Sequence, residues 1–141
     1  MCLLLAGFAA QAQPAAMTGK WANDKSKTQV DEHTSGVLTI ENRTSTWNIF
    51  NNQMFLDLSN RMRDDTLLLI YKSCDCTSTY KASAIKFPKA GSIVAKCYRA
   101  ADGRLGVIYV NKKFVSSVRS YAQMSNSEKQ AIFPDYFYKA K

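Results

Sequence analysis

The residues best suited to chemistry are cysteines, and two of them form the motif Cys74-Asp75-Cys76. Such a pair could exchange disulfides or bind a soft metal, because thiolates select zinc or copper(I). A structural zinc site needs four ligands, and beyond the first twelve residues the chain adds only Cys97 and His33, without ligand-like spacing. We therefore expect no metal site, and we interpret these cysteines as a disulfide or as buried thiols.

Two states are open for Cys97. A Cys76–Cys97 disulfide is slightly favoured, although a turn at 88–91 would place Cys97 opposite Ala82 and leave Cys76 on the order of 20 Å farther along its strand. A bridge needs Cα atoms within about 7 Å of each other. The bridge thus requires the Cys74-Asp75-Cys76 segment to fold back. Otherwise Cys97 is a buried free thiol and the Cys-x-Cys pair stands alone.

The single histidine, His33, follows Asp31 and Glu32, so a general acid–base pair is conceivable. Adjacent residues rarely converge on one substrate, however, and no nucleophile lies beside them. The chain also has no Gly-x-Ser-x-Gly elbow and no glycine-rich phosphate loop. We interpret His33 as a solvated loop residue and expect no catalytic residue and no cofactor.

The first twelve residues are uncharged and apolar, and they end in Ala10-Gln11-Ala12. This pattern is typical of a secretory signal peptide, with cleavage before Gln13. The run is shorter than the roughly 20 apolar residues that a membrane-spanning helix needs. We expect residues 1–12 to be a signal peptide, the remainder to be secreted or periplasmic, and no membrane span.

The chain has 141 residues and a net charge of +8, which fits one exported, basic domain over residues 13–141. The positive charge favours encounter with an acidic partner, although the lysines are scattered rather than clustered. Aromatic and cationic residues interleave in 136–141, as in proteins that stack on single-stranded nucleic acid. An exported protein rarely meets that substrate, so we expect no nucleic-acid partner and interpret the tail as a closing edge strand.

Short β-type runs dominate the pattern and are separated by turn-forming residues. The expected strands are Thr18–Asn23, Gly36–Glu41, Thr44–Phe50, Gln53–Leu58, Thr66–Ser73, Ser78–Phe87, Ser92–Arg99 and Arg104–Asn111. Asp102-Gly103 gives the strongest hairpin signal. Helical spacing of Val115, Val118 and Ala122, a capping box at Ser125–Glu128 and a stop at Pro134 then predict a helical flank. The fold class is all-β: a small antiparallel barrel of about eight strands with a short C-terminal helix and a final aromatic strand.

The first strand carries Thr18-Gly19-Lys20-Trp21, a Gly-x-Trp pattern that resembles the opening of the calycin barrels: lipocalins, fatty-acid-binding proteins and avidins. The resemblance covers about seven residues and implies an up-and-down barrel. It makes Gly19 and Trp21 structural residues and Asn23 a ligand contact. Avidin pockets are walled by several tryptophans, whereas this chain has only 2, so biotin binding is not expected.

Two functions follow from this interpretation. The first is binding of a small apolar or amphipathic molecule inside the barrel, with the expected contacts Asn23, Trp47, Leu68, Ile70, Val107 and Tyr109. The second is a protein-binding inhibitor or immunity-type module for an acidic partner. Both describe a binding protein without catalysis.

Overall fold

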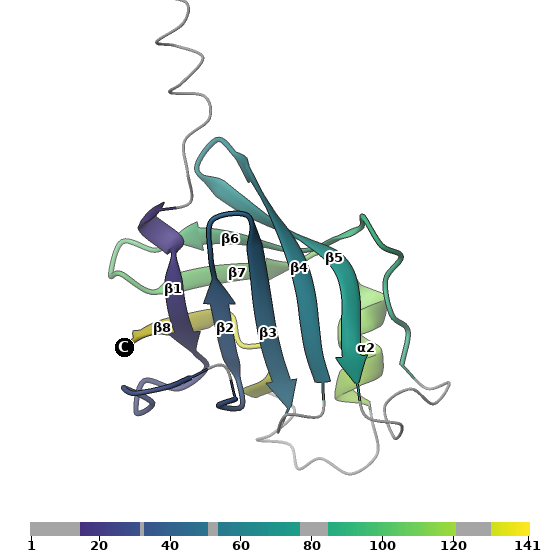
Figure 1. Ribbon diagram of the computed structural model, residues 1–141, viewed down its shortest axis with the longest axis horizontal. Coiled ribbons are helices and arrows are strands. Elements are labelled where there is room, and N and C mark those ends of the chain that lie inside the picture. Colours follow the sequence, from purple (N-terminus) through teal and green to yellow (C-terminus); the bar gives the residue numbers. More distant parts are fainter. Residues whose placement is uncertain (1–14, 32, 51–53, 77–84, 121–130) are drawn as a thin grey trace, which may run out of the picture.

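The computed structural model describes residues 15–31, 33–50, 54–76, 85–120 and 131–141. The predicted signal peptide, residues 1–12, lies outside these residues. Eight antiparallel strands close into a barrel in sequence order, and β1 pairs with β8 to complete it (Figure 1). The strands are β1 (Gly19–Ala22), β2 (Val37–Ile40), β3 (Thr44–Phe50), β4 (Met54–Arg63), β5 (Thr66–Cys76), β6 (Ile93–Arg99), β7 (Leu105–Tyr109) and β8 (Tyr136–Ala140). The prediction of an eight-stranded up-and-down barrel is confirmed.

Local turn chemistry sets the hairpins. At the β6–β7 turn, Asp102 Oδ1 accepts a hydrogen bond from the Arg104 backbone N–H, and Gly103 has φ +89°, a backbone conformation that suits glycine. At the β4–β5 turn, Asp64 has φ 53°, which aspartate tolerates better than most residues. The hairpin predicted at Asp102-Gly103 is therefore present.

The helical elements sit at the two ends of the barrel. The 3-10 helix η1 (Ala15–Met17) precedes β1, and the α-helix α2 (Lys112–Arg119) follows β7. Asn111 caps α2, because its Oδ1 accepts a hydrogen bond from the Phe114 backbone N–H at 3.1 Å. The predicted helical residues Val115 and Val118 lie in α2 and are buried, whereas Ala122 and the capping box at Ser125–Glu128 lie outside the described residues. Ala131 and Ile132 are helical just before Pro134.

One predicted strand and the pairing that followed from it need correction. Residues 78–84 of the predicted strand Ser78–Phe87 lie outside the described residues, and Ile85–Phe87 form no strand. The partner of β6 is instead β5, so Cys97 lies opposite Leu67 rather than Ala82. The eighth strand is β8, at the position of the predicted final aromatic strand.

The core fills the barrel interior. Alternate strand residues point inward, and these inward side chains, with residues of α2 and segment 132–133, form one buried cluster. A register shift between β4 and β5 and another between β5 and β6 bend the long strand β5 around this core. A smaller cluster lies apart from it and comprises Ala22, Val30, Val37 and Ala140.

Candidate functional site

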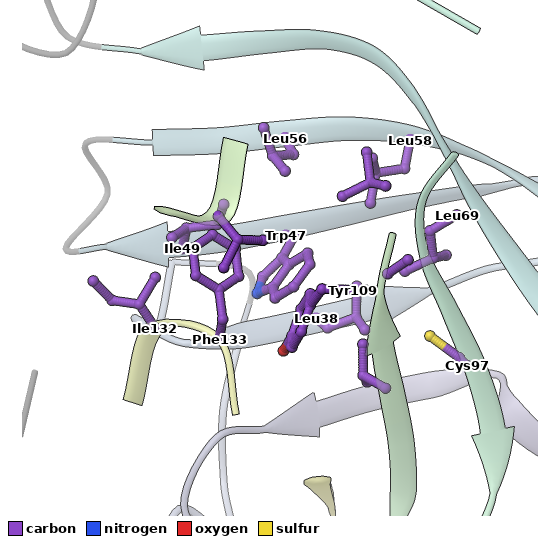
Figure 2. Close-up of a cluster of buried hydrophobic side chains, with 14 of the residues drawn as sticks. Leu38, Trp47, Ile49, Leu56, Leu58, Leu69, Cys97, Tyr109, Ile132 and Phe133 are labelled. Carbon is purple, nitrogen blue, oxygen red and sulfur yellow. The ribbon is translucent and has the colours of Figure 1, made fainter. Parts of the chain in front are cut away.

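An aromatic cluster occupies the barrel interior around Trp47, which is fully buried on β3. The Trp47 ring stacks on Tyr109 of β7 at 6.0 Å between ring centroids and meets the edges of Phe133 at 5.6 Å and Phe137 at 5.7 Å. Figure 2 shows the Phe133 ring beside the Trp47 indole, with Leu56 and Leu58 above them in this view. Three of these four rings come from barrel strands, and Phe133 is the exception.

Phe133 belongs to the segment that leads into β8, which we call the plug (residues 131–134). Phe114, the first buried residue of α2, supports it, because the two rings lie 5.9 Å apart. Ile132 and Phe133 are 3% and 1% exposed. The plug therefore completes the interior without belonging to a strand ladder.

Side chains from three different elements fasten the plug through its backbone carbonyls. Asn23 Nδ2, just after β1, donates to the Ala131 carbonyl at 3.0 Å. Arg119 Nη2, at the end of α2, donates to the Phe133 carbonyl at 2.7 Å, and the Tyr109 hydroxyl donates to the carbonyl of Pro134. Burial raises the pKa of Tyr109 far above its usual value, so its hydroxyl keeps its proton and remains a donor.

Two buried donors in the described part of the chain have no hydrogen-bond acceptor, Trp47 Nε1 and Arg119 Nε. Both belong to side chains that touch Phe133: the Trp47 ring meets its edge, and the Arg119 guanidinium lies 5.6 Å from its ring centroid. An unsatisfied buried N–H costs about 1–3 kcal/mol, and most such groups in native proteins are paired. Both side chains with an unsatisfied donor therefore pack against the same ring of the plug, that of Phe133.

At the opposite end of the barrel, the indole N–H of the other tryptophan, Trp21, has a hydrogen-bond acceptor. Trp21 Nε1 donates to the Met17 carbonyl of η1 at 2.7 Å, and Arg99 and Lys139 lie 5.0 Å and 4.9 Å from the Trp21 ring centroids. Gly19 has φ +129°, and a side chain there would collide with Lys139. Gly19 and Trp21 thus make close contacts at the start of the barrel, and their structural role stays a prediction.

The six predicted ligand contacts fall into three places. Trp47, Val107 and Tyr109 lie together in the interior cluster, and Asn23 lies beside the plug. Leu68 and Ile70 lie outside the interior cluster, whereas their neighbours Leu67, Leu69 and Tyr71 belong to it. Leu68 is paired with the exposed Lys96, on the outer face of the barrel. Assigning Leu68 and Ile70 to the interior was wrong, because four consecutive apolar residues hide which alternate positions point inward.

The predicted Cys76–Cys97 disulfide is also wrong. Cys74 and Cys76 are bridged, with their Cα atoms 5.7 Å apart, and Cys97 is a buried free thiol. Residues two apart on a strand share a face, so the Cys-x-Cys pair needs no fold-back. Cys97 lies opposite Leu67 near the start of β5, while Cys76 is at its far end, on the order of 30 Å away. Burial raises the pKa of Cys97 to about 12.

His33 lines a depression on the outer wall rather than the interior. The other lining residues are Thr46, Phe55, Asp57 and Asp75, and the volume is about 340 Å³. Asp31 Oδ1 accepts from the His33 backbone N–H, which is a loop-capping bond rather than an acid–base contact with the imidazole. No group of three His, Cys, Asp or Glu side chains close enough to hold a metal occurs among the described residues.

Several residues of the site were missed from the sequence: Phe114, Arg119, Ile132 and Phe133. One clue was present, since Ile132 and Phe133 are consecutive large apolar residues immediately before the helix-stopping Pro134. Their inward placement depends on the return of the chain from α2 to β8, a long-range arrangement that residue periodicity does not encode.

Comparison with known proteins adds no assignment, since no protein-family model, curated protein or solved structure matches the chain. The fold and the site thus define the class: a small closed antiparallel β-barrel with a buried aromatic cluster. In the described part of the chain, no helix has the length and apolar character needed to cross a membrane.

Proposed function

We propose that the protein binds a small apolar or amphipathic molecule in the barrel, at the position that Phe133 occupies in this structure. The observation that carries the proposal is the buried Trp47 indole N–H, which lacks an acceptor inside an aromatic cluster. Binding pockets for small molecules combine apolar and aromatic walls with a few placed polar groups, and an eight-stranded barrel has room for one small ligand. A ligand with an oxygen acceptor would satisfy this donor.

The plug can move aside for a ligand without disturbing the strand pairing of the barrel. Phe133 and Ile132 lie outside the strands, so their displacement leaves every β-ladder intact. The plug is held through side-chain hydrogen bonds from Asn23, Arg119 and Tyr109. The two bonds from neutral donors are each worth about 0.5–1.5 kcal/mol net, and the bond from the charged Arg119 is worth about 1.5–3 kcal/mol. Entry of a ligand therefore needs rearrangement of one short segment.

We also propose that the protein belongs to the calycin group of barrels and that it is exported. The first-strand Gly19-x-Trp21 and the eight-stranded up-and-down closure support membership of that group of barrels. The Cys74–Cys76 disulfide supports export with removal of residues 1–12, because disulfides persist in oxidising compartments. On this view the mature protein is a secreted or periplasmic binding protein.

Native mass spectrometry of the chain purified from its exported fraction tests the proposal. The expected result is a retained non-covalent adduct of small-molecule mass, more abundant in Phe133→Ala because that change opens space beside Trp47. Phe87→Ala is the matched control, since Phe87 packs on Phe114 at 5.8 Å and makes no ring contact with Trp47 in the described structure. The proposal fails if both variants and the wild-type chain carry no adduct and take up no added amphipath.

The outer wall favours a second function, recognition of an acidic protein. Ile108 on β7 is 54% exposed and lies opposite the exposed Lys96, and Arg104 lies 3.8 Å from the ring centroid of Tyr136. Apolar, tyrosine and arginine side chains together are typical of protein interfaces. In this case Lys96→Glu should slow association with the acidic partner and weaken its salt dependence, and unchanged association kinetics would exclude this surface.

A further inference from the structure

We infer that Lys27, in the loop between β1 and β2, keeps the plug closed by fixing the side-chain amide of Asn23 in one orientation. This inference rests on the proposed binding function and concerns the regulation of that site. Asn23 donates to the Ala131 carbonyl of the plug, although the two residues are 108 positions apart in the sequence. The side-chain hydrogen bonds of Lys27 in the described structure go to Asn23 and Ser35. Lys27 is therefore a positioning residue, which acts on the plug through Asn23.

The Asn23 amide has two chemically different ends, and Lys27 decides which of them faces the plug. Lys27 Nζ donates to Asn23 Oδ1 at 2.8 Å and to the Ser35 carbonyl at 2.7 Å. An ammonium group has three donors and no acceptor, so only the amide oxygen can bond to it. The amide nitrogen is thereby directed to the Ala131 carbonyl, to which it donates at 3.0 Å. With the amide turned round, two donors would meet at Lys27 and two oxygens at the plug, and neither bond would form.

The loop backbone keeps Asn23 within reach of both partners. The Asn23 backbone N–H donates to the Gly36 carbonyl at 3.1 Å, and Gly36 has φ +79°. A Cβ at position 36 would lie only 2.2 Å from Asn23 Nδ2. Glycine there lets the chain pack directly on the Asn23 amide. Asn23 is thus held by its backbone N–H as well as by both ends of its side chain.

Among the three side chains that fasten the plug, Asn23 makes the bond that water replaces most easily. Its bond to Ala131 is exposed, whereas the bonds from Arg119 and Tyr109 are partly buried. Segments held by solvent-exposed hydrogen bonds open at lower free energy than the core. The plug therefore starts to open at Ala131, and Lys27 sets how often it does so.

Hydrogen exchange followed by mass spectrometry tests the inference on the full chain without any ligand. Lys27→Met keeps an unbranched apolar side chain but removes the donors. Peptides that cover Ile132 and Phe133 should then exchange about three- to tenfold faster, the factor expected for loss of one hydrogen bond, while peptides from the β6–β7 hairpin should be unchanged. Lys25→Met is the matched control, since it removes the same charge from an exposed lysine of the same loop, and it should leave both exchange rates unchanged.

A double substitution separates positioning of Asn23 from a general effect on the loop. Because Lys27 acts through Asn23, Lys27→Met should not accelerate plug exchange any further once Asn23→Ala is present. Full additivity of the two changes overturns the inference. Unchanged plug exchange in Lys27→Met alone, or a rise of equal size in the hairpin peptides, also overturns it. If Lys27→Met does not fold, Lys27→Gln decides: its amide can present either an oxygen or an N–H to Asn23 and enforces no orientation, so plug exchange must still accelerate.

The outcomes separate this inference from the function on which it rests. Failure of the exchange experiments removes the role of Lys27 and leaves ligand uptake by the barrel intact. If neither the wild-type chain nor Phe133→Ala carries an adduct or takes up an added amphipath, the binding function is overturned together with its regulation, whatever the exchange rates of the plug.

Discussion

The two tryptophans provide a matched pair for measuring the cost of the unsatisfied donor. Both are fully buried, but Trp21 Nε1 donates to the Met17 carbonyl and Trp47 Nε1 has no acceptor. Trp21→Phe and Trp47→Phe delete the same atoms, so the transfer and cavity contributions to the free energy of unfolding are similar for the two. The comparison therefore leaves two differences between the tryptophans, the hydrogen bond of the indole N–H and the contacts of Arg99 and Lys139 with the Trp21 ring.

The expected magnitude follows from the contacts. Trp21→Phe loses a hydrogen bond with a net worth of about 1 kcal/mol and weakens the attraction of Arg99 and Lys139 for the ring. Trp47→Phe removes an unpaired donor and so recovers about 1–3 kcal/mol. We expect Trp21→Phe to be more destabilising than Trp47→Phe by roughly 2–4 kcal/mol.

Urea unfolding followed by far-ultraviolet circular dichroism measures this difference without relying on tryptophan emission. With a slope of about 2 kcal/mol per molar urea, the two midpoints should differ by on the order of 1–2 M. Equal midpoints, or a lower midpoint for Trp47→Phe, would refute the conclusion that the Trp47 donor is unsatisfied in solution. The proposed binding site would then lose its main support.

Three further predictions concern the core, the thiol and pH. Leu105→Ala should cost about 2–5 kcal/mol of unfolding free energy, because Leu105 is fully buried, while Ile108→Ala on the outer wall should stay within about 0.5 kcal/mol; urea midpoints compare them. Cys97 should resist iodoacetamide at about pH 8 in the native protein and react once unfolded, as its raised pKa leaves almost no thiolate; peptide mapping that finds native labelling of Cys97 contradicts its burial. Hydrogen bonds from the Arg104 backbone and side chain lower the pKa of Asp102, so its stabilising contribution is present above about pH 4 and lost as pH falls further; unfolding midpoints between pH 6 and pH 3 should fall less in Asp102→Asn than in the wild-type chain.

The sequence predicted best those features whose causes are local. The β6–β7 hairpin depends on the Asp102 side chain and on the freedom of Gly103, and both act within four residues of the turn. The all-β class followed from the density of short strand-type runs.

Features that depend on strand partners were predicted less well. The apolar run Leu67–Ile70 shows no alternation, so its inward face becomes visible only from pairing with β6. Pairing β6 with the predicted strand Ser78–Phe87 put Cys97 opposite the wrong residue, because adjacent runs were taken to be adjacent strands. The same error favoured a Cys76–Cys97 disulfide over the local Cys74–Cys76 bridge, although two cysteines two residues apart on one strand already face the same side.

The energetics of the two barrel ends explain why a ligand would enter at the plug and not at Trp21. Moving Phe133 out of the interior costs about 1.5–3 kcal/mol of lost apolar burial, and breaking its carbonyl bond to the charged Arg119 adds about 1.5–3 kcal/mol. An amphipath with an oxygen acceptor, as proposed above, restores the apolar burial with its own body and gives Trp47 Nε1 an acceptor, which is worth about 1–3 kcal/mol. At the other end, displacing Met17 breaks the hydrogen bond that Trp21 Nε1 already makes. A ligand there would at best replace that bond, so its binding would gain no net hydrogen bond. Binding at the plug should accordingly raise the stability of the folded chain with ligand concentration.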